Sequence, residues 1–297
     1  MIAILGSANM DLVVTVERAP GRGETVTGRT FVTVPGGKGA NQALAAARAG
    51  GQVAFLGAVG GDEFGRGITD LLTGAGIDVS GLTVSDQPTG TAHITVDASG
   101  DNSIVVVPGA NGTVTALTDA HRAGIDAADL LLLQLELPLG LVVEAARYAR
   151  SRGVRVVLTP APAVPLPVEL LDAVDVLVPN EHEAALLAGV DDPVAAARNL
   201  AGRGGDVVVT LGSQGALWLH DGGEWPVPAF PVQAVDTTAA GDTFVGVLAV
   251  GLAEGVEWAE ALRRAAAAAA LSVQRPGASS SMPHRAEIDA FLAKAAA

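Results

Sequence analysis

The chain has 297 residues, of which 49% are hydrophobic and none is cysteine. This composition allows one large apolar core and excludes disulfides and thiolate metal sites. The formal net charge is -14 and only 3% of the residues are aromatic, which argues against the basic, aromatic surface of nucleic-acid-binding proteins. We find no apolar run near the ~18 residues of a membrane span and no secretory signal, so we expect a cytoplasmic protein.

Short apolar segments alternate with Ala- and Leu-rich segments along most of the chain. Strands are predicted at residues 2–5, 53–56, 130–133, 154–158, 174–178 and 207–210, and a helix is predicted at 38–49. This alternation is typical of a doubly wound, mainly parallel α/β sheet flanked by helices. We therefore expect a single α/β domain spanning residues 1–297.

Two regions interrupt this alternation. Residues 13–34 and 90–107 lack a helical pattern and contain turn-forming pairs, Pro20-Gly21 and Ser99-Gly100. We predict lid strands inserted at about 12–34 and 90–107, which form a small β-sheet lid projecting from the domain.

The segment Val235-Asp236-Thr237-Thr238-Ala239-Ala240-Gly241-Asp242-Thr243-Phe244 is the strongest local motif. It follows a strand-like segment at residues 231–235 and opens a predicted helix that runs to about Ala253. Small residues at a helix start leave backbone N–H groups free to bind an anion. Asp242 would then lie where it can take a proton from a hydroxyl beside that anion. The alternative is that Asp242 only caps the helix.

Four segments together resemble the ribokinase-like (PfkB) carbohydrate kinases. Residues 236–244 resemble the family's C-terminal signature, and residues 35–43 (PGGKGANQA) resemble its glycine-rich N-terminal signature. Residues 180–183 match its N-x-x-E motif, and residues 7–11 resemble its sugar-binding opening. The resemblance runs from about Ile4 to Phe291 and implies a sugar kinase that uses ATP and Mg²⁺. By contrast, Gly37-Lys38 is followed by Gly39 and does not form a P-loop.

The resemblance implies a sugar site near the N-terminus. Asn9 and Asp11 stand two apart at the end of the first strand, so they point to one face, and their polar groups suit sugar hydroxyls. The adjacent glycines allow close backbone approach, and Asn41 lies one helical turn after Lys38. Whether Lys38 contacts sugar or phosphate stays open. The implied sugar-binding residues are Asn9, Asp11, Gly36, Gly37, Lys38, Asn41, Glu136 and Asp242.

The nucleotide site is implied at the carboxyl ends of later strands, where α/β sheets bind ligands. Glu183 is implied to act on Mg²⁺ through water. The alternatives are a helix cap at residues 180–183 and an ordinary hairpin at 210–215. Some family members carry His or Asn near the adenine, where this chain has Ala266. The implied nucleotide-binding residues are Asn180, Glu183, Thr210, Gly212, Ser213, Gly215 and Gly241.

The implied reaction is in-line phosphoryl transfer with Asp242 as the base, kept ionised by the helix start. Backbone N–H groups of Ala239, Ala240, Gly241 and Asp242 would stabilise the charge on the phosphate. The family also implies an activating monovalent cation, K⁺. The alternative is that Asp236 only caps a turn and that residues 279–281 form a solvated loop. The implied cation-binding residues are Asp236, Thr238, Ser272, Arg275, Gly277 and Ser281.

The family branch that phosphorylates ribose fits these motifs best. We therefore expect ATP-dependent phosphorylation of the 5-hydroxymethyl group of D-ribose, giving ribose 5-phosphate and ADP, by a homodimer that pairs through its lids. The alternatives are a kinase for deoxyribose, fructose, a ketodeoxy acid or a nucleoside, and a non-catalytic sugar- or nucleotide-binding sensor.

Overall fold

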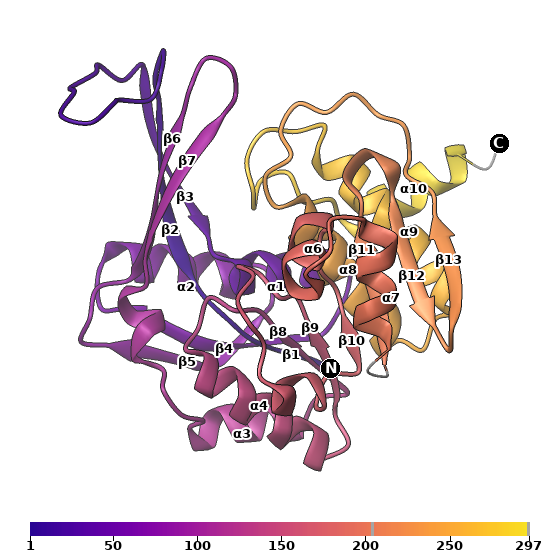
Figure 1. Ribbon diagram of the computed structural model, residues 1–297. Coiled ribbons are helices and arrows are strands. Elements are labelled where there is room, and N and C mark those ends of the chain that lie inside the picture. Colours follow the sequence, from indigo (N-terminus) through magenta and orange to yellow (C-terminus); the bar gives the residue numbers. More distant parts are fainter. Residues whose placement is uncertain (203–204, 296–297) are drawn as a thin grey trace.

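The computed structural model describes residues 1–202 and 205–295, which form two sheets and the helices around them (Figure 1). The large sheet has the strand order β13-β12-β11-β10-β9-β8-β1-β4-β5. It is parallel from β5 to β11, and β12 and β13 continue it as an antiparallel edge. The predicted doubly wound sheet is confirmed, while β5, β12 and β13 were not predicted. Its strands are β1 (Ile2–Leu5), β4 (Val53–Gly60), β5 (Asp78–Ser85), β8 (Leu130–Leu133), β9 (Arg155–Leu158), β10 (Val176–Leu177), β11 (Asp206–Thr210), β12 (Ala216–His220) and β13 (Gly223–Val227).

Strand β1 lies inside this sheet because all four of its residues are apolar and buried. Successive side chains of a strand point to opposite faces. Ile2 and Ile4 accordingly enter one hydrophobic core, and Ala3 and Leu5 enter the other. A strand with no polar face needs a cover on both sides, and the helices provide it.

The helices divide between the two faces. Helices α1, α2, α8, α9 and α10 contribute side chains to the core of Ile2 and Ile4, and α3 to α7 contribute to the core of Ala3 and Leu5. None of the helices in the described residues is long and apolar enough to span a membrane. The helices are α1 (Lys38–Arg48), α2 (Glu63–Gly74), α3 (Asp119–Asp126), α4 (Leu139–Ser151), α5 (Val168–Leu171), α6 (Glu181–Ala188), α7 (Pro193–Ala201), α8 (Ala240–Ala253), α9 (Trp258–Ser272) and α10 (Arg285–Ala295).

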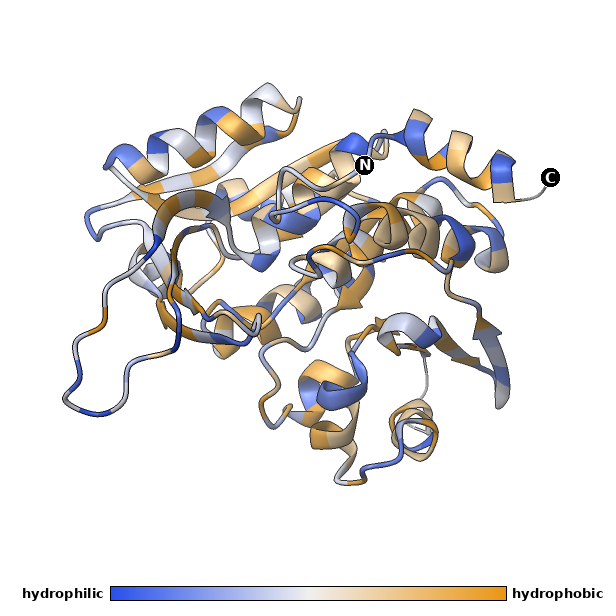
Figure 2. Cartoon of the chain, turned by 90° about the horizontal axis from the view of Figure 1, so that it is seen from above, coloured by the Kyte–Doolittle hydropathy of each residue, from blue (hydrophilic) through white to orange (hydrophobic). Residues whose placement is uncertain are grey.

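The small sheet projects from the body of the domain, as predicted (Figure 1). Its order is β3-β2-β6-β7, with β2 (Asn9–Thr15), β3 (Thr30–Gly36), β6 (Gly90–Val96) and β7 (Asn102–Val107). Two antiparallel hairpins are joined by the parallel pair β2–β6. Because β2 begins at Asn9 and β3 ends at Gly36, the sheet reaches further into the sugar motifs than the predicted boundaries. Figure 2 shows hydrophilic residues in the long loop that extends from the domain.

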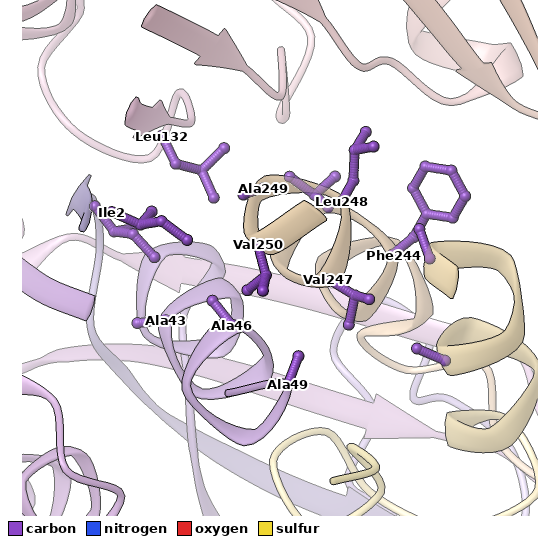
Figure 3. Close-up of a cluster of buried hydrophobic side chains, with 14 of the residues drawn as sticks. Ile2, Ala43, Ala46, Ala49, Leu132, Phe244, Val247, Leu248, Ala249 and Val250 are labelled. Carbon is purple, nitrogen blue, oxygen red and sulfur yellow. The ribbon is translucent and has the colours of Figure 1, made fainter. Parts of the chain in front are cut away.

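Helices α1 and α8 pack closely because small residues line their contact. Ala46 of α1 lies beside Val250 of α8 (Figure 3), and Ala43 and Val247 belong to the same core cluster. At Gly246 of α8, an added Cβ would lie 2.7 Å from the Ala45 Cβ and 2.7 Å from the Gln42 carbonyl oxygen. Only glycine permits this approach, which brings the first turn of α8 to the start of α1.

Replacing this glycine tests the contact. We expect Gly246→Ala to lower the free energy of unfolding by about 1–3 kcal/mol, because the new methyl group must displace the α1 backbone. The matched control is Gly67→Ala on the exposed side of α2, where nothing lies within 4 Å of an added Cβ. That variant should gain about 0.5–1 kcal/mol from its higher helix propensity. Urea unfolding measures both, and equal stabilities would contradict the packing argument.

Candidate active site

Asp242 lies in the first turn of α8 and faces α1. Its Oδ2 accepts a hydrogen bond from Asn41 Nδ2 at 3.2 Å, and its Oδ1 accepts one from Gln42 Nε2 at 3.0 Å. The side chain is 9% exposed. The capping position belongs to Ala239, whose φ of 57° is left-handed. The interpretation of Asp242 as a helix cap is therefore wrong, and its carboxylate is available for chemistry.

The turn before Asp242 presents backbone N–H groups, although fewer than predicted. The Ala240 N–H donates to the Thr237 carbonyl at 3.2 Å, so it is already engaged. Within residues 1–202 and 205–295, the N–H groups of Ala239, Gly241 and Asp242 have no acceptor. Free donors at the N-terminus of a helix form an anion-binding site. The predicted anion site thus retains three of its four donors, in the same turn as Asp242.

The predicted sugar residues gather where the lid meets the large sheet. Asn9 pairs with Gly36 across β2 and β3 and is 3% exposed. The Asp11 carboxylate rests against Gly36, where an added Cβ would lie 2.2 Å from Oδ2. Glu136 follows β8, and its Oε2 accepts hydrogen bonds from Ser7 Oγ at 2.5 Å and from the Lys38 backbone N–H at 3.0 Å. Residues from three elements therefore converge on one polar cluster.

The charged groups of this cluster shift one another's pKa values. Burial, together with Glu136 and Asp242, raises the pKa of Asp11 to about 7. Burial also raises the pKa of Asp242, against the opposing effects of Lys38 and the two amide donors. Burial alone would lower the pKa of Lys38, but Asp242, Glu136 and Glu183 raise it. The expectation that the helix start keeps Asp242 ionised is thus opposed by burial, which favours a carboxyl that can take up a proton.

Apart from Gly241 of α8, the predicted nucleotide residues lie at or just after the carboxyl ends of β10 and β11. Asn180 caps α6 in a reciprocal pair with Glu183, and Asn180 forms a parallel bridge with Thr210. Residues 210–215 turn through a short 3₁₀ helix (Gly212–Gln214) between the antiparallel strands β11 and β12. Both simpler interpretations, a cap and a hairpin, describe the local geometry, and nucleotide binding remains a prediction. Glu183 is near enough to Lys38 to raise its pKa, which links this edge to the polar cluster.

Asp236 contacts two of the other predicted cation residues, Thr238 and Gly277. One carboxylate oxygen accepts from the Thr238 backbone N–H at 2.9 Å, and the other accepts from the Gly277 N–H at 2.8 Å. These donors lower the pKa of Asp236, although partial burial opposes them. Ser281 is fully buried, so the alternative of a solvated loop is wrong there. The atoms predicted to bind the cation are carboxylate, carbonyl and hydroxyl oxygens, which suit a hard cation.

Arg48 at the end of α1 holds this loop, because its Nη1 donates to the carbonyls of Ser279 at 2.5 Å and Met282 at 3.0 Å. The segment 231–235 before Asp236 is irregular rather than a strand. Its last residue, Val235, is anchored by its N–H to the Val273 carbonyl at 2.7 Å.

Sequence analysis gave no role to three buried amides. Asn111 donates to Asn9 Oδ1 at 2.8 Å and exchanges two hydrogen bonds with the Ala8 backbone. Gln42 and Gln134 form a second chain behind Asp242. Gln42 could have been noticed inside the glycine-rich motif, but no local pattern singles out Asn111 or Gln134.

A doubly wound α/β domain with a β lid, a buried polar cluster and free N–H groups beside a carboxylate defines a class of carbohydrate kinases. The chain belongs to the pfkB family of carbohydrate kinases, whose sequence profile matches residues 1–285. It is 45% identical to a ribokinase of Bacillus subtilis over 98% of this chain and 99% of the relative. A ribokinase structure from Thermotoga maritima matches with a TM-score of 0.92 at 38% identity, covering 99% of both chains. An Arabidopsis thaliana ribokinase, complexed with ribose and ATP, matches with a TM-score of 0.92 at 37% identity and 98% coverage of both.

The raised pKa of Asp11 predicts a pH-dependent stability. In the unfolded chain this carboxyl ionises near its ordinary value of 3.8, whereas in the folded protein it ionises near 7. Its favourable contribution to stability is therefore present below about pH 4 and is lost as the pH rises through about 7. Asp11→Asn removes this loss, so its unfolding free energy should rise relative to wild type over that range. Urea unfolding at several pH values measures the difference, with Asp70→Asn on the exposed side of α2 as control. Parallel pH curves for all three proteins would contradict the assignment.

Proposed function

We propose that this protein transfers the γ-phosphoryl group of ATP to the 5-hydroxymethyl group of D-ribose, giving ribose 5-phosphate and ADP. The observation that carries the proposal is the position of Asp242. Its carboxylate is buried between the polar cluster of Asn9, Asp11 and Asn41 and the free N–H groups of its own helix turn. The similarity to ribokinases over the full chain supports ribose as the acceptor.

In the proposed reaction, Asp242 accepts the proton of the ribose hydroxyl as its oxygen attacks the γ-phosphorus. The new P–O bond forms as the bond to the bridging oxygen breaks, and its electron pair leaves with ADP. The N–H groups of Gly241 and Asp242 stabilise the charge on the transferring group, and Lys38 adds a half-buried cation nearby. Bound Mg²⁺ would neutralise phosphate charge, with Glu183 as the nearby carboxylate that holds it through water. We place the enzyme in the cytoplasm, where ATP is available.

A coupled assay of ADP release tests the activity. We expect turnover with ribose to exceed turnover with deoxyribose, fructose, a ketodeoxy acid or a nucleoside. Asp242→Asn should lower kcat by about 10²–10⁴-fold, because the amide cannot accept the proton. Calorimetry should show that this variant still binds ribose. A wild-type protein that binds sugar without releasing ADP would instead be a sensor, and faster turnover of another sugar would reassign the substrate.

We further propose that K⁺ binds between Asp236 and the loop at residues 272–281. The support is the hydrogen bond that the Gly277 backbone N–H donates to the Asp236 carboxylate, together with the burial of Ser281. A cation at this position would fix the turn at Thr238 and, through it, the N–H groups of Gly241 and Asp242. It would act without contacting the substrate.

At constant ionic strength, we expect K⁺ to raise kcat relative to tetramethylammonium, which is too large for such a site. Asp236→Ala should abolish this response, because it removes the one carboxylate among the proposed ligands. Arg275→Gln changes a side chain while preserving the carbonyl ligand, so it should still respond. Equal rates in the two salts, after removal of K⁺ and NH₄⁺, would refute the proposal.

We propose that two chains pair through their lids. The lid strands expose apolar side chains, including Phe31 at 62% and Val105 at 65%, and its outer strands β3 and β7 leave unpaired edges. Such edges and faces are usually covered in native proteins. Light scattering at micromolar concentration should give the mass of a dimer, and Val105→Lys should shift it toward the monomer. A monomeric wild-type protein would contradict the pairing.

A further inference from the structure

Two glutamine side chains are buried behind the base. Gln42 of α1 is fully buried and Gln134, which follows β8, is 1% exposed. A buried amide without partners is costly, so such groups are kept where their hydrogen bonds are made. Both belong to one chain of contacts that ends at Asp242.

The chemistry of the acceptors fixes the direction of this chain. An ionised carboxylate can only accept, so Gln42 must turn its Nε2 toward Asp242 Oδ1, at 3.0 Å. Its Oε1 then faces away from the base and accepts from Gln134 Nε2 at 2.6 Å. The Thr159 hydroxyl lies 3.4 Å from the same Gln42 Nε2. Gln42 thus has a partner at each end of its amide.

Gln134 has little room to move. An added Cβ at Gly6 would lie 2.2 Å from Gln134 Oε1 and 2.6 Å from the Gly39 Cα. This Oε1 is buried and has no hydrogen-bond partner in the described part of the chain. The packing against Gly6 and the donation from Nε2 to Gln42 together hold the Gln134 amide in place, although its Oε1 has no partner. The large sheet, through β8, thereby supports the side chain that holds the base.

We propose that Gln42 is a positioning residue for the base, held in its orientation by Gln134. It fixes Asp242 Oδ1 on the core side. Oδ2, which Asn41 contacts, is left facing the polar cluster of Asn9, Asp11 and Asn41. The inference rests on the proposed kinase function. It assigns a role to two side chains that do not touch either substrate in the proposed arrangement.

The charged groups that face Asp242 are Lys38 of α1, Glu136 after β8 and Asp11 of β2. Gln42 is neutral, so replacing it with another neutral residue alters its hydrogen bonds and leaves the charges of the site unchanged. Loss of a donor to a carboxylate favours its protonated form. The acid limb of the pH profile of kcat should therefore move to higher pH.

The first test is Gln42→Met, which keeps the length of the side chain and removes the donor. We expect kcat to fall about tenfold, the KM for ribose to stay within about twofold, and the acid limb to move upward. Gln42→Glu is nearly isosteric and places a second carboxylate beside Asp242, so it should move the limb further. Gln52→Met on the exposed surface after α1 is the matched control and should match wild type.

Gln134→Glu tests the direction of the chain. Its carboxylate would attract Gln42 Nε2, reverse that amide and point its oxygen at Asp242. We expect a fall in kcat like that of Gln42→Met, although Gln134 makes no contact with Asp242. Because Gln134 acts through Gln42, the double variant with Gln42→Met should be no slower than the slower single variant. Additive losses would indicate that Gln134 acts independently and would refute its role in the chain.

A carboxyl-carbon NMR titration separates this inference from the proposed function. The Asp242 signal is identified by its absence in Asp242→Asn, and its pKa should be higher in Gln42→Met than in wild type. If the wild type phosphorylates ribose while kcat and the Asp242 titration are unchanged in both Gln42 variants, the positioning role is overturned and the function stands. If the titration shifts but no sugar is phosphorylated, the coupling stands and the function fails.

Discussion

The close contact between α1 and α8 is the constraint on which the rest of the site depends. Gly246 has no side chain, so the α8 backbone can lie against Ala45 and the carbonyl of Gln42. The same approach places Asp242 within hydrogen-bonding distance of the amides of Asn41 and Gln42. Two sequence motifs 200 residues apart thereby become one site. Packing of small residues and catalytic geometry are consequences of the same interhelical distance.

Electrostatics in the site run against the charge of the whole chain. A net charge of -14 repels a nucleotide at long range. Local groups must therefore hold the phosphates, and the structure offers the N–H groups of Gly241 and Asp242 and the half-buried Lys38. The carboxyl groups of Asp242, Glu136 and Glu183 act on Lys38, and Asp11 lies near two of them, Glu136 and Asp242. The pKa of about 7 for Asp11 means that this crowding is relieved in part by a proton.

Much of the site could be predicted because its residues lie in short motifs with local meaning. Alternating apolar segments predicted the parallel sheet, and the small residues before Asp242 predicted a helix start with free N–H groups. The sequence did not show which residue of this segment caps the helix. The cap is Ala239, in a left-handed conformation, and not Asp242. Segment 231–235 was predicted as a strand from its composition, but it is irregular. The Val235 N–H donates to the Val273 carbonyl and not to a neighbouring strand. Asn111 and Gln134 carry no local signal, since their roles depend only on distant partners.

The separation between Gln42 and Asp242 also governs when the site can exist during synthesis. At typical translation rates of about 5–20 residues per second, roughly 10–40 seconds pass between the two residues. During that interval the sheet face that receives Ile2 and Ile4 lacks α8 and α9, which supply much of its apolar cover. Long-range contacts of this kind also slow folding, because a large loop must close before they form. A nascent chain of this protein therefore exposes an apolar sheet face until α8 and α9, in its last fifth, emerge, and exposed apolar surface of this kind favours aggregation.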